Sequence, residues 1–250
     1  MHCMQYSTIY YRHPDRHPEN PLRHKKDLGF ILKLFWEGFW FVFWTLILAL
    51  SILRIFVFQQ VKVNGQSMDP NYHDGQMLLI NRSDQEVSRG QVVAVYARKD
   101  VAAKANYFTP FDPTNIFFLK RVVGLPGESI EMIGSKVIIY NQEFPEGAIL
   151  VEPYLSQKVI QEMEESNFYF PKTMIEQDHY FLMGDNRKYS RDSREVGTFP
   201  KYTIFGKEVL RYWPLEEVRT FQIPNYSFAK IDPETNSKLI QARLNFTKTL

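Results

Sequence analysis

The 250-residue sequence predicts a mainly β protein in which one N-terminal transmembrane helix is followed by an antiparallel β domain. Two observations predict this class. The stretch 38–53 carries no charge, and from about residue 62 the chain consists of short β-branched and aromatic segments separated by glycine and proline. We expect a cytoplasmic tail over residues 1–28, an anchor over 29–58, a β domain over 59–222 and an extension over 223–250.

The uncharged stretch 38–53 reads GFWFVFWTLILALSIL. As a helix it would rise about 24 Å, which is short of the roughly 30 Å hydrocarbon core of a bilayer. If the Arg54 side chain reaches back to the interface, the span extends to Phe58 and is long enough. A buried core helix is the alternative, but soluble helices rarely stay apolar on every face. A cleavable secretory signal would need a small-residue cleavage site, which this segment lacks.

Basic residues are more frequent before the apolar stretch than after it, where only Arg54 and Lys62 follow closely. Cytoplasmic flanks of membrane helices are enriched in lysine and arginine. We therefore expect residues 1–28 to be a short disordered tail in the cytoplasm and the chain from Gln59 onward to lie across the membrane. The basic residues before the stretch are Arg12, Arg16, Arg23, Lys25, Lys26 and Lys33.

Composition argues against disulfides, cysteine-rich metal sites and nucleic-acid binding. The single cysteine, Cys3, rules out an intramolecular disulfide and a cysteine-rich metal site, and the four histidines of the tail are irregularly spaced. A net charge of +2 does not suggest nucleic acid, whose binders concentrate basic charge. We expect no cofactor and no metal.

Six segments beyond the anchor have the composition of strands, and the turn signals DG, RG, LPGE and FPEG separate several of them. One stretch, 152–168, is compatible with a helix. The extension is polar and weakly patterned, so its order is uncertain. The expected strands are QMLLINR, QVVAVYA, IFFLKRVVG, SKVIIYNQEF, HYFLMG and KEVLRYW.

The turn NGQSMDP, residues 64–70, presents Ser67 shortly after the membrane segment. A serine hydroxyl is a poor nucleophile until a base accepts its proton. Beyond the anchor the histidine candidates are His73 and His179, and neither has a recognisable triad context. Lys120 is the other candidate, because IFFLKRVVG places it on one strand face with Phe118 and Val122. Burial there would lower its pKa, whereas an edge-strand lysine that discourages aggregation is the plainer interpretation.

The loop GDNRKYSRDSREVG, residues 184–197, is almost wholly polar and follows an apolar strand directly. A solvated connection is the ordinary interpretation of such a loop. It also supplies the hydroxyls of Ser190 and Ser193 to orient a lysine amine. We expect two charge pairs to brace it, Asp185 with Arg187 and Asp192 with Arg194.

Together these stretches resemble type I signal peptidase, a membrane-anchored serine peptidase with a serine–lysine dyad. The motifs SMDP, GQVVAVY, LKRVVGLPGE, GDNRKYSRDSREVG and GKEVLRYWPLEEV occur in the order of that family. The resemblance implies a β-sheet catalytic domain like that of signal peptidases and LexA. It implies Ser67 as nucleophile, Lys120 as general base, Met68 packed beside the dyad, Ser190 as hydrogen-bond partner of the lysine amine, and Asp192 with Arg194 as the pair that supports the loop.

The same resemblance implies the substrate and the location. The substrates would be signal peptides of exported preproteins, bound as an extended strand at the outer face of the plasma membrane, in contact with lipid and near the secretion translocon. Gly65 stands where some members carry a serine that assists the oxyanion, so backbone groups must serve here. Asn71 replaces a usual threonine and Glu128 a usual aspartate; we expect both to affect only details of the substrate pocket.

Three alternatives remain open at this point. A LexA-type self-cleaving protein shares the fold and the serine–lysine pair, but it would not carry this membrane segment. An inactive membrane-anchored module that binds exported peptides would lack Ser67 or Lys120. The endoplasmic-reticulum branch of signal peptidases uses histidine where LKRVVG supplies lysine.

Overall fold

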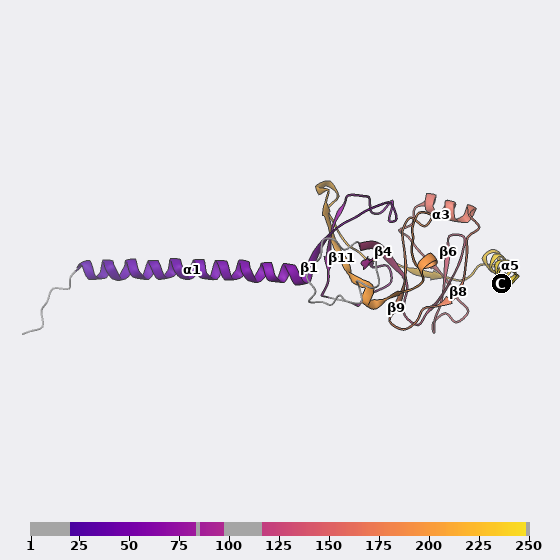
Figure 1. Cartoon of the computed structure of the whole chain (residues 1–250), viewed down its shortest axis with the longest axis horizontal. Coiled ribbons are helices and arrows are strands. Elements are labelled where there is room, and N and C mark those ends of the chain that lie inside the picture. The colour runs from indigo at the N-terminus through magenta and orange to yellow at the C-terminus, as the bar shows by residue number, and fades with distance from the viewer. Residues whose placement is uncertain (1–20, 84–85, 98–116, 249–250) are drawn as a thin grey trace, which may run out of the picture. The chain divides into compact units, whose positions relative to one another are not determined.

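A computed structural model describes residues 21–83, 86–97 and 117–248 of the chain. The chain divides into two compact units, Met1–Ser51 and Ile52–Leu250, which are described separately below. Figure 1 shows the course of the chain through both.

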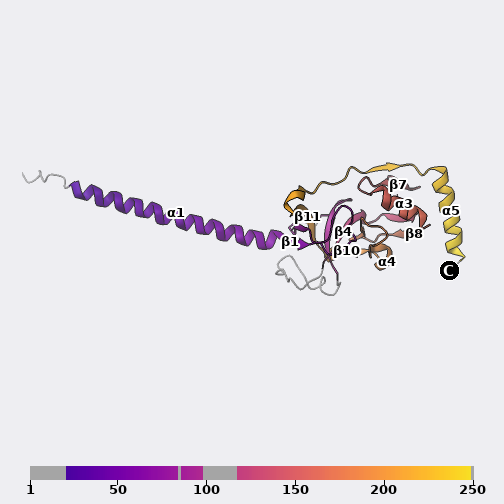
Figure 2. The ribbon, with the colours of Figure 1, turned by 90° about the horizontal axis from the view of Figure 1, so that it is seen from above.

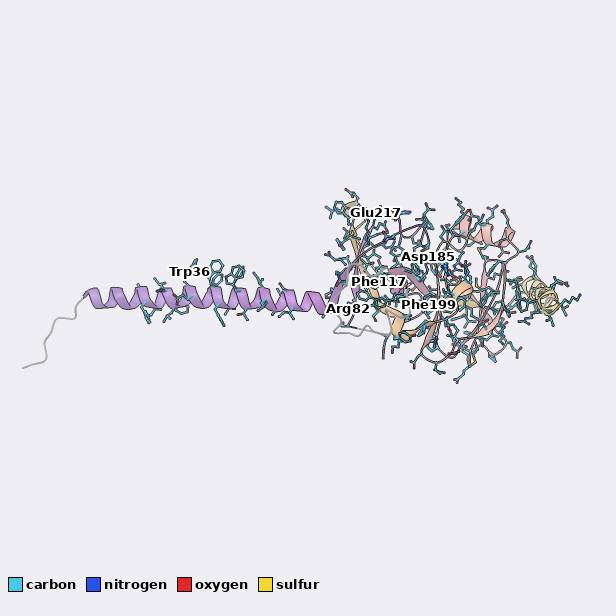
Figure 3. All side chains as sticks on the ribbon, viewed as in Figure 1. Trp36, Arg82, Phe117, Asp185, Phe199 and Glu217 are labelled. Atoms are coloured by element: carbon cyan, nitrogen blue, oxygen red, sulfur yellow. The ribbon has the colours of Figure 1, made fainter. Side chains whose placement is uncertain are left out.

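The first unit contains most of one long helix, α1, which spans Pro21–Val57. Its segment Leu28–Ile52 is long and apolar enough to cross a membrane, and its side chains are exposed along the whole segment. Figure 3 shows Trp36 projecting from this helix. The helix begins at Pro21, whose fixed φ suits a first helical position. Residues 21–28, expected to belong to a disordered tail, are therefore helical, and residues 1–20 lie outside the described residues.

The second unit is built on two antiparallel sheets, as the sequence predicts. The larger sheet is eight-stranded, with order β1-β2-β11-β3-β4-β9-β10 and β12 paired to β11. Its strands are β1 Phe58–Lys62, β2 Met77–Asn81, β3 Val92–Tyr96, β4 Phe117–Gly124, β9 His179–Met183, β10 Phe199–Pro200, β11 Ile204–Trp213 and β12 Arg219–Thr220.

The smaller sheet is five-stranded, with order β13-β7-β6-β5-β8. It comprises β5 Ser129–Ile133, β6 Lys136–Tyr140, β7 Ala148–Val151, β8 Tyr169–Met174 and β13 Ser227–Ala229. Helix α3, Gln157–Glu165, lies within the stretch expected to be helical, and Ser156 caps its N-terminus. The remaining short elements are α4 Ser193–Val196, η1 Lys201–Thr203 and η2 Leu215–Glu217.

All six expected strand segments contain a strand, whereas the other strands were not anticipated, among them β5, β7 and β8 of the smaller sheet. Each of these three is short or carries residues atypical of strands, such as the buried Glu131 of β5 and Pro171 of β8. Packing within the smaller sheet outweighs their weak local preference.

The extension 223–250, whose order the sequence left open, contains a strand and a helix within its described residues. Strand β13 joins the edge of the smaller sheet, and helix α5, Pro233–Thr247, lies beyond β6 and β8 (Figures 1 and 2). Leu239 of α5 is only 1% exposed, and Arg243 donates two hydrogen bonds to the buried carboxylate of Glu131. Because α5 is held by one buried apolar residue and an ion pair, its sequence shows no clear apolar periodicity.

Strand β4 lies near the centre of the larger sheet and is buried over its last six residues. Its partner β3 is buried at every position. A strand covered on both faces has no exposed side for polar residues. The adjacent Lys120 and Arg121 of β4 are therefore both buried, at 2% and 3% exposure.

Candidate active site

The turn after β1 presents Ser67 and fixes it through its neighbour. Met68 is 1% exposed and packs in the hydrophobic cluster of the larger sheet, while Ser67 is only partly buried. The Met68 carbonyl accepts a hydrogen bond from the Tyr72 N–H at 3.0 Å, which closes the turn. Gly65 has φ +84°, a conformation that favours glycine, and its N–H donates to Asp74 Oδ1 at 2.7 Å. The serine side chain thus stands on an anchored backbone with its hydroxyl accessible.

Lys120 reaches this turn from β4, and its Nζ donates a hydrogen bond of 2.8 Å to Ser67 Oγ. The amine lies 5.6 Å from the centroid of the Phe118 ring, on the strand face that the sequence predicts. Burial disfavours the ammonium form and lowers the pKa of Lys120 to about 8, although Asp192 and Asp185 act in the opposite direction. The lysine is therefore buried and adjacent to a hydroxyl, and a substantial fraction is neutral near pH 8.

The structure does not give Ser190 the contact with Lys120 that the resemblance implies. Its hydroxyl is buried and has no hydrogen bond within the described part of the chain. The hydroxyl contributes to lowering the pKa of Asp192, so it lies close to that carboxylate. The polar loop thus brings Ser190 to the site without joining it to the amine.

Asp192 and Arg194 form the expected ion pair, with Nε of Arg194 2.8 Å from Oδ1 of Asp192 and Nη2 2.7 Å from Oδ2. Asp192 also caps α4 and accepts a hydrogen bond from the Gly184 N–H at 3.0 Å. These donors lower the pKa of Asp192 against the effect of burial. Both ends of the loop are fixed by this one carboxylate.

The expected pairing of Asp185 with Arg187 is wrong. Asp185 is 1% exposed and accepts two hydrogen bonds from the guanidinium of Arg121, one of them 2.7 Å from Nε. Arg187 instead pairs with Glu152 of the chain that follows β7. The two residues are close in sequence, but one side chain reaches β4 of the larger sheet and the other reaches the segment after β7. Asp185 is labelled in Figure 3.

Tyr154 connects these two ion pairs. Its ring lies 4.0 Å from the Arg121 guanidinium carbon, and its hydroxyl accepts from Arg187 Nη2 at 3.0 Å. Its carbonyl accepts a 3.0 Å hydrogen bond from Asn71, whose amide also donates to Asp185 at 2.8 Å. We call Arg121, Asp185, Arg187, Glu152 and Tyr154 the buried polar cluster. Through Asn71 it holds the turn that carries Ser67.

The loop also contacts the Ser67 turn directly. The backbone N–H of Asn186 donates to the Ser67 carbonyl at 3.1 Å, and its side-chain amide donates to the Gln66 carbonyl at 3.0 Å. Gly184 lies so close that a Cβ there would be 2.3 Å from the Ser67 carbonyl oxygen and 2.2 Å from Ser190 Oγ. The first residues of the loop thus set the position of the nucleophile's backbone.

These contacts were missed by sequence reasoning, although one signal was available. Arg121 follows Lys120 in an apolar strand, so if both are buried one of them needs a carboxylate. A second buried pair, Tyr72 with Glu208, has no comparable signal, because its members are far apart in the chain. Burial raises the pKa of Glu208 to about 7 while Tyr72 donates to it.

The two histidines considered as bases are bonded elsewhere. His73 Nδ1 lies 2.8 Å from Asp69 Oδ1, and His179 Nδ1 lies 3.0 Å from the Gln177 carbonyl oxygen. Among the described residues, no group of three histidine, cysteine or acidic side chains is arranged to hold a metal ion. Lys120 is therefore the basic group that the structure places against Ser67.

Comparison with protein families agrees with this geometry. Residues 36–213 match the sequence model of the family described as "Signal peptidase, peptidase S26". The chain belongs to this family. The assignment confirms the resemblance inferred from the motifs and makes the chain a serine endopeptidase of the S26 family, whose members are anchored in membranes.

Several curated signal peptidases are similar to the chain over most of their length. Signal peptidase I of Bacillus licheniformis is 31% identical over 183 residues, which cover 70% of this chain and 87% of that protein. Signal peptidase I of Bacillus amyloliquefaciens is 30% identical over 175 residues, with 67% and 83% covered. Signal peptidase I of Streptococcus pneumoniae is 26% identical over 218 residues, with 73% and 95% covered.

Gly184→Ala should lower the rate of signal-peptide cleavage by about 100-fold or more, because the new Cβ would displace the Ser67 backbone and Ser190. Initial rates on a preprotein substrate, with a thermal unfolding scan to verify folding, would measure this. Gly38→Ala is the matched control, since nothing lies within 4 Å of a Cβ at that position. Full activity in Gly184→Ala would show that the close approach of loop and nucleophile is not required.

Proposed function

We propose that this protein is a membrane-anchored serine endopeptidase that removes signal peptides from exported preproteins, with Ser67 as nucleophile and Lys120 as general base. The observation that carries the proposal is the 2.8 Å hydrogen bond between the buried Lys120 amine and the Ser67 hydroxyl. A peptide-binding module without activity would not need a buried lysine that, among the described residues, hydrogen-bonds a serine hydroxyl and forms no ion pair.

The chemistry follows from the protonation state of the amine. Neutral Lys120 accepts the Ser67 proton as Oγ attacks the scissile carbonyl carbon, and the resulting ammonium donates a proton to the leaving amine. The second half repeats the transfer with water, which releases the acyl group and restores Ser67. Within the described residues the Ser67 N–H has no backbone acceptor, so it is free to donate to the oxyanion. With Gly65 two residues earlier, no side-chain hydroxyl assists from that position.

The substrate would bind as an extended strand beside the first half of β4. Residues 117–120 pair with β3 on one edge, whereas β9 pairs with β4 only from Arg121 onward. Among the described strands, none occupies the other edge of residues 117–120. An added peptide strand there would run past Lys120 and bring its carbonyl to Ser67. The substrate class, signal peptides of exported preproteins, comes from the family.

Location follows from α1 and its flanking charges. We propose a single-pass protein of the plasma membrane, with the N-terminus in the cytoplasm and residues 59–250 on the outer face in contact with lipid. Lysine and arginine precede the apolar span in excess, which supports this orientation. Proximity to the secretion translocon would follow from the substrate, which is still tethered by its signal peptide.

Replacing either member of the dyad should abolish cleavage and leave folding intact. Ser67→Ala removes the nucleophile. Lys120→Arg and Lys120→Met should both be inactive, because guanidinium has no lone pair to accept a proton and methionine has no base. Rates would be measured with detergent-solubilised protein and a peptide containing an alanine-x-alanine site.

Lys62→Met is the control for loss of a positive charge, since Lys62 is exposed, and it should remain close to wild type. Ser190→Ala should be impaired to a lesser degree than the dyad variants. Cleavage by Lys120→Met together with its loss in His73→Ala or His179→Ala would replace the dyad by a serine–histidine mechanism.

Cleavage should become faster as the pH rises through about 8, the pKa of Lys120. The reactive form is the neutral amine, so below that pH the rate should change about ten-fold per pH unit and above it level off. A profile of kcat/KM between pH 6 and 10 would test this. A rising limb centred near pH 6.5, the ordinary value for histidine, would contradict lysine as the base.

Protease added to spheroplasts should degrade the domain from residue 59 onward and spare the segment before Gly29, since only the outer face is accessible. A protease-sensitive epitope at each end of the chain would report the two sides by immunoblot. Detergent lysis is the control and should expose both ends. Protection of the C-terminal epitope in intact spheroplasts would reverse the proposed orientation.

A further inference from the structure

A segment at the start of the extension, residues 221–229, spans the two sheets of the second unit. Phe221 packs against the hydrophobic cluster of the larger sheet, and its N–H donates to the Val209 carbonyl at 2.9 Å. Phe228 packs in the cluster of the smaller sheet, where β13 pairs with β7. Figure 2 shows this segment running along one face of the unit toward α5. We call residues 221–229 the strap; it lies outside the matched residues 36–213.

Between these two ends, Tyr226 rests on the buried polar cluster. Its ring lies 6.1 Å from the Tyr154 ring, at an edge-on angle of 72°. The ring also fills the space above Gly90, where a Cβ would come within 2.2 Å of it. The Gly90 carbonyl accepts a 2.9 Å hydrogen bond from Arg121 Nη1. Tyr226 therefore packs against two groups that contact Arg121 directly, the Tyr154 ring and Gly90.

The strap also lines a small cavity beside Arg121. This cavity of about 90 Å³ is lined by Asn71, Arg121 and Tyr154 together with Phe221, Gln222 and Pro224. Without the strap, this side of Arg121 would open to bulk water. Ion pairs and hydrogen bonds weaken as the surrounding dielectric rises. The ion pair between Arg121 and Asp185 thus depends on residues that follow the last family motif in the chain.

We propose that the strap is a built-in part of the catalytic apparatus and that Tyr226 is a positioning residue for the dyad. It acts through the buried polar cluster, which joins the strand of Lys120, the turn of Ser67 and the loop 184–197. Tyr226 touches neither member of the dyad, so its loss should slow the chemical step and leave substrate binding unchanged. The proposal rests on the proposed peptidase function.

The test compares variants of the full-length protein in detergent on a preprotein substrate, with kcat, KM and the unfolding temperature measured for each. Tyr226→Ala should lower kcat by about ten-fold or more and leave KM within about two-fold. Tyr226→Phe should stay within about two-fold of wild type, because the ring is kept and the buried hydroxyl has no hydrogen-bond partner in the described part of the chain.

Leu239→Ala is the matched control for stability. Leu239 is the buried apolar residue of α5 and packs in a separate cluster with Ile138 and Tyr140, so this variant should lower the unfolding temperature and keep the wild-type kcat. If Tyr226→Ala is unfolded at the assay temperature, Tyr226→Leu takes its place under the same criteria.

Two outcomes would overturn the proposal: a folded Tyr226→Ala protein with wild-type kcat, or an equal loss of kcat in Leu239→Ala. Absence of cleavage by the wild-type protein would instead contradict the proposed function, so the two failures are distinguishable.

Discussion

Two neighbouring basic residues, Lys120 and Arg121, are buried on β4, and the active site depends on the different partners that their side chains contact. Arg121 faces Asp185, whose charge and hydrogen bonds outweigh the effect of burial and raise the arginine pKa. Lys120 faces the Ser67 hydroxyl, and carboxylates act on it only through space. Desolvation therefore dominates and lowers its pKa to about 8. Arg121 therefore stays charged and holds the loop, while the neighbouring Lys120 has an amine that can lose its proton.

The density of charge in the loop 184–197 follows from this arrangement. Asp185, Arg187 and Asp192 are all nearly fully buried, and each has a buried partner of opposite charge. Buried ion pairs are often no more stabilising than apolar residues of the same volume. Their contribution here lies in geometry: Asp185 and Arg187 tie the loop to β4 and to the segment after β7, and the pair of Asp192 with Arg194 braces the loop internally. A loop that sequence composition describes as solvated is instead the most constrained part of the site.

The smaller sheet contacts the site without contributing a residue to the dyad. Glu152 and Tyr154 follow its strand β7 and hold Arg187 and Arg121, which belong to the loop and to the larger sheet. The strap returns from the larger sheet to β7 over the same cluster. The two sheets therefore share one buried polar interface, and the position of Ser67 relative to Lys120 depends on both.

The sequence by itself determined the fold class, the apolar anchor, the family and the identity of the two residues that meet at 2.8 Å. These features are local: an uncharged run, alternating strand faces and motifs each carried by a few consecutive residues. Only the tertiary structure decided which charges pair, because Asp185 and Arg187 are neighbours in the chain but reach partners 64 and 35 residues away. It likewise decided that the extension is folded, since β13 and α5 are stabilised by a neighbouring strand and by Glu131 rather than by their own apolar pattern. Buried ion pairs and the addition of a strand to a sheet edge join residues that are far apart in the chain. The local periodicity of the sequence therefore does not predict these partners.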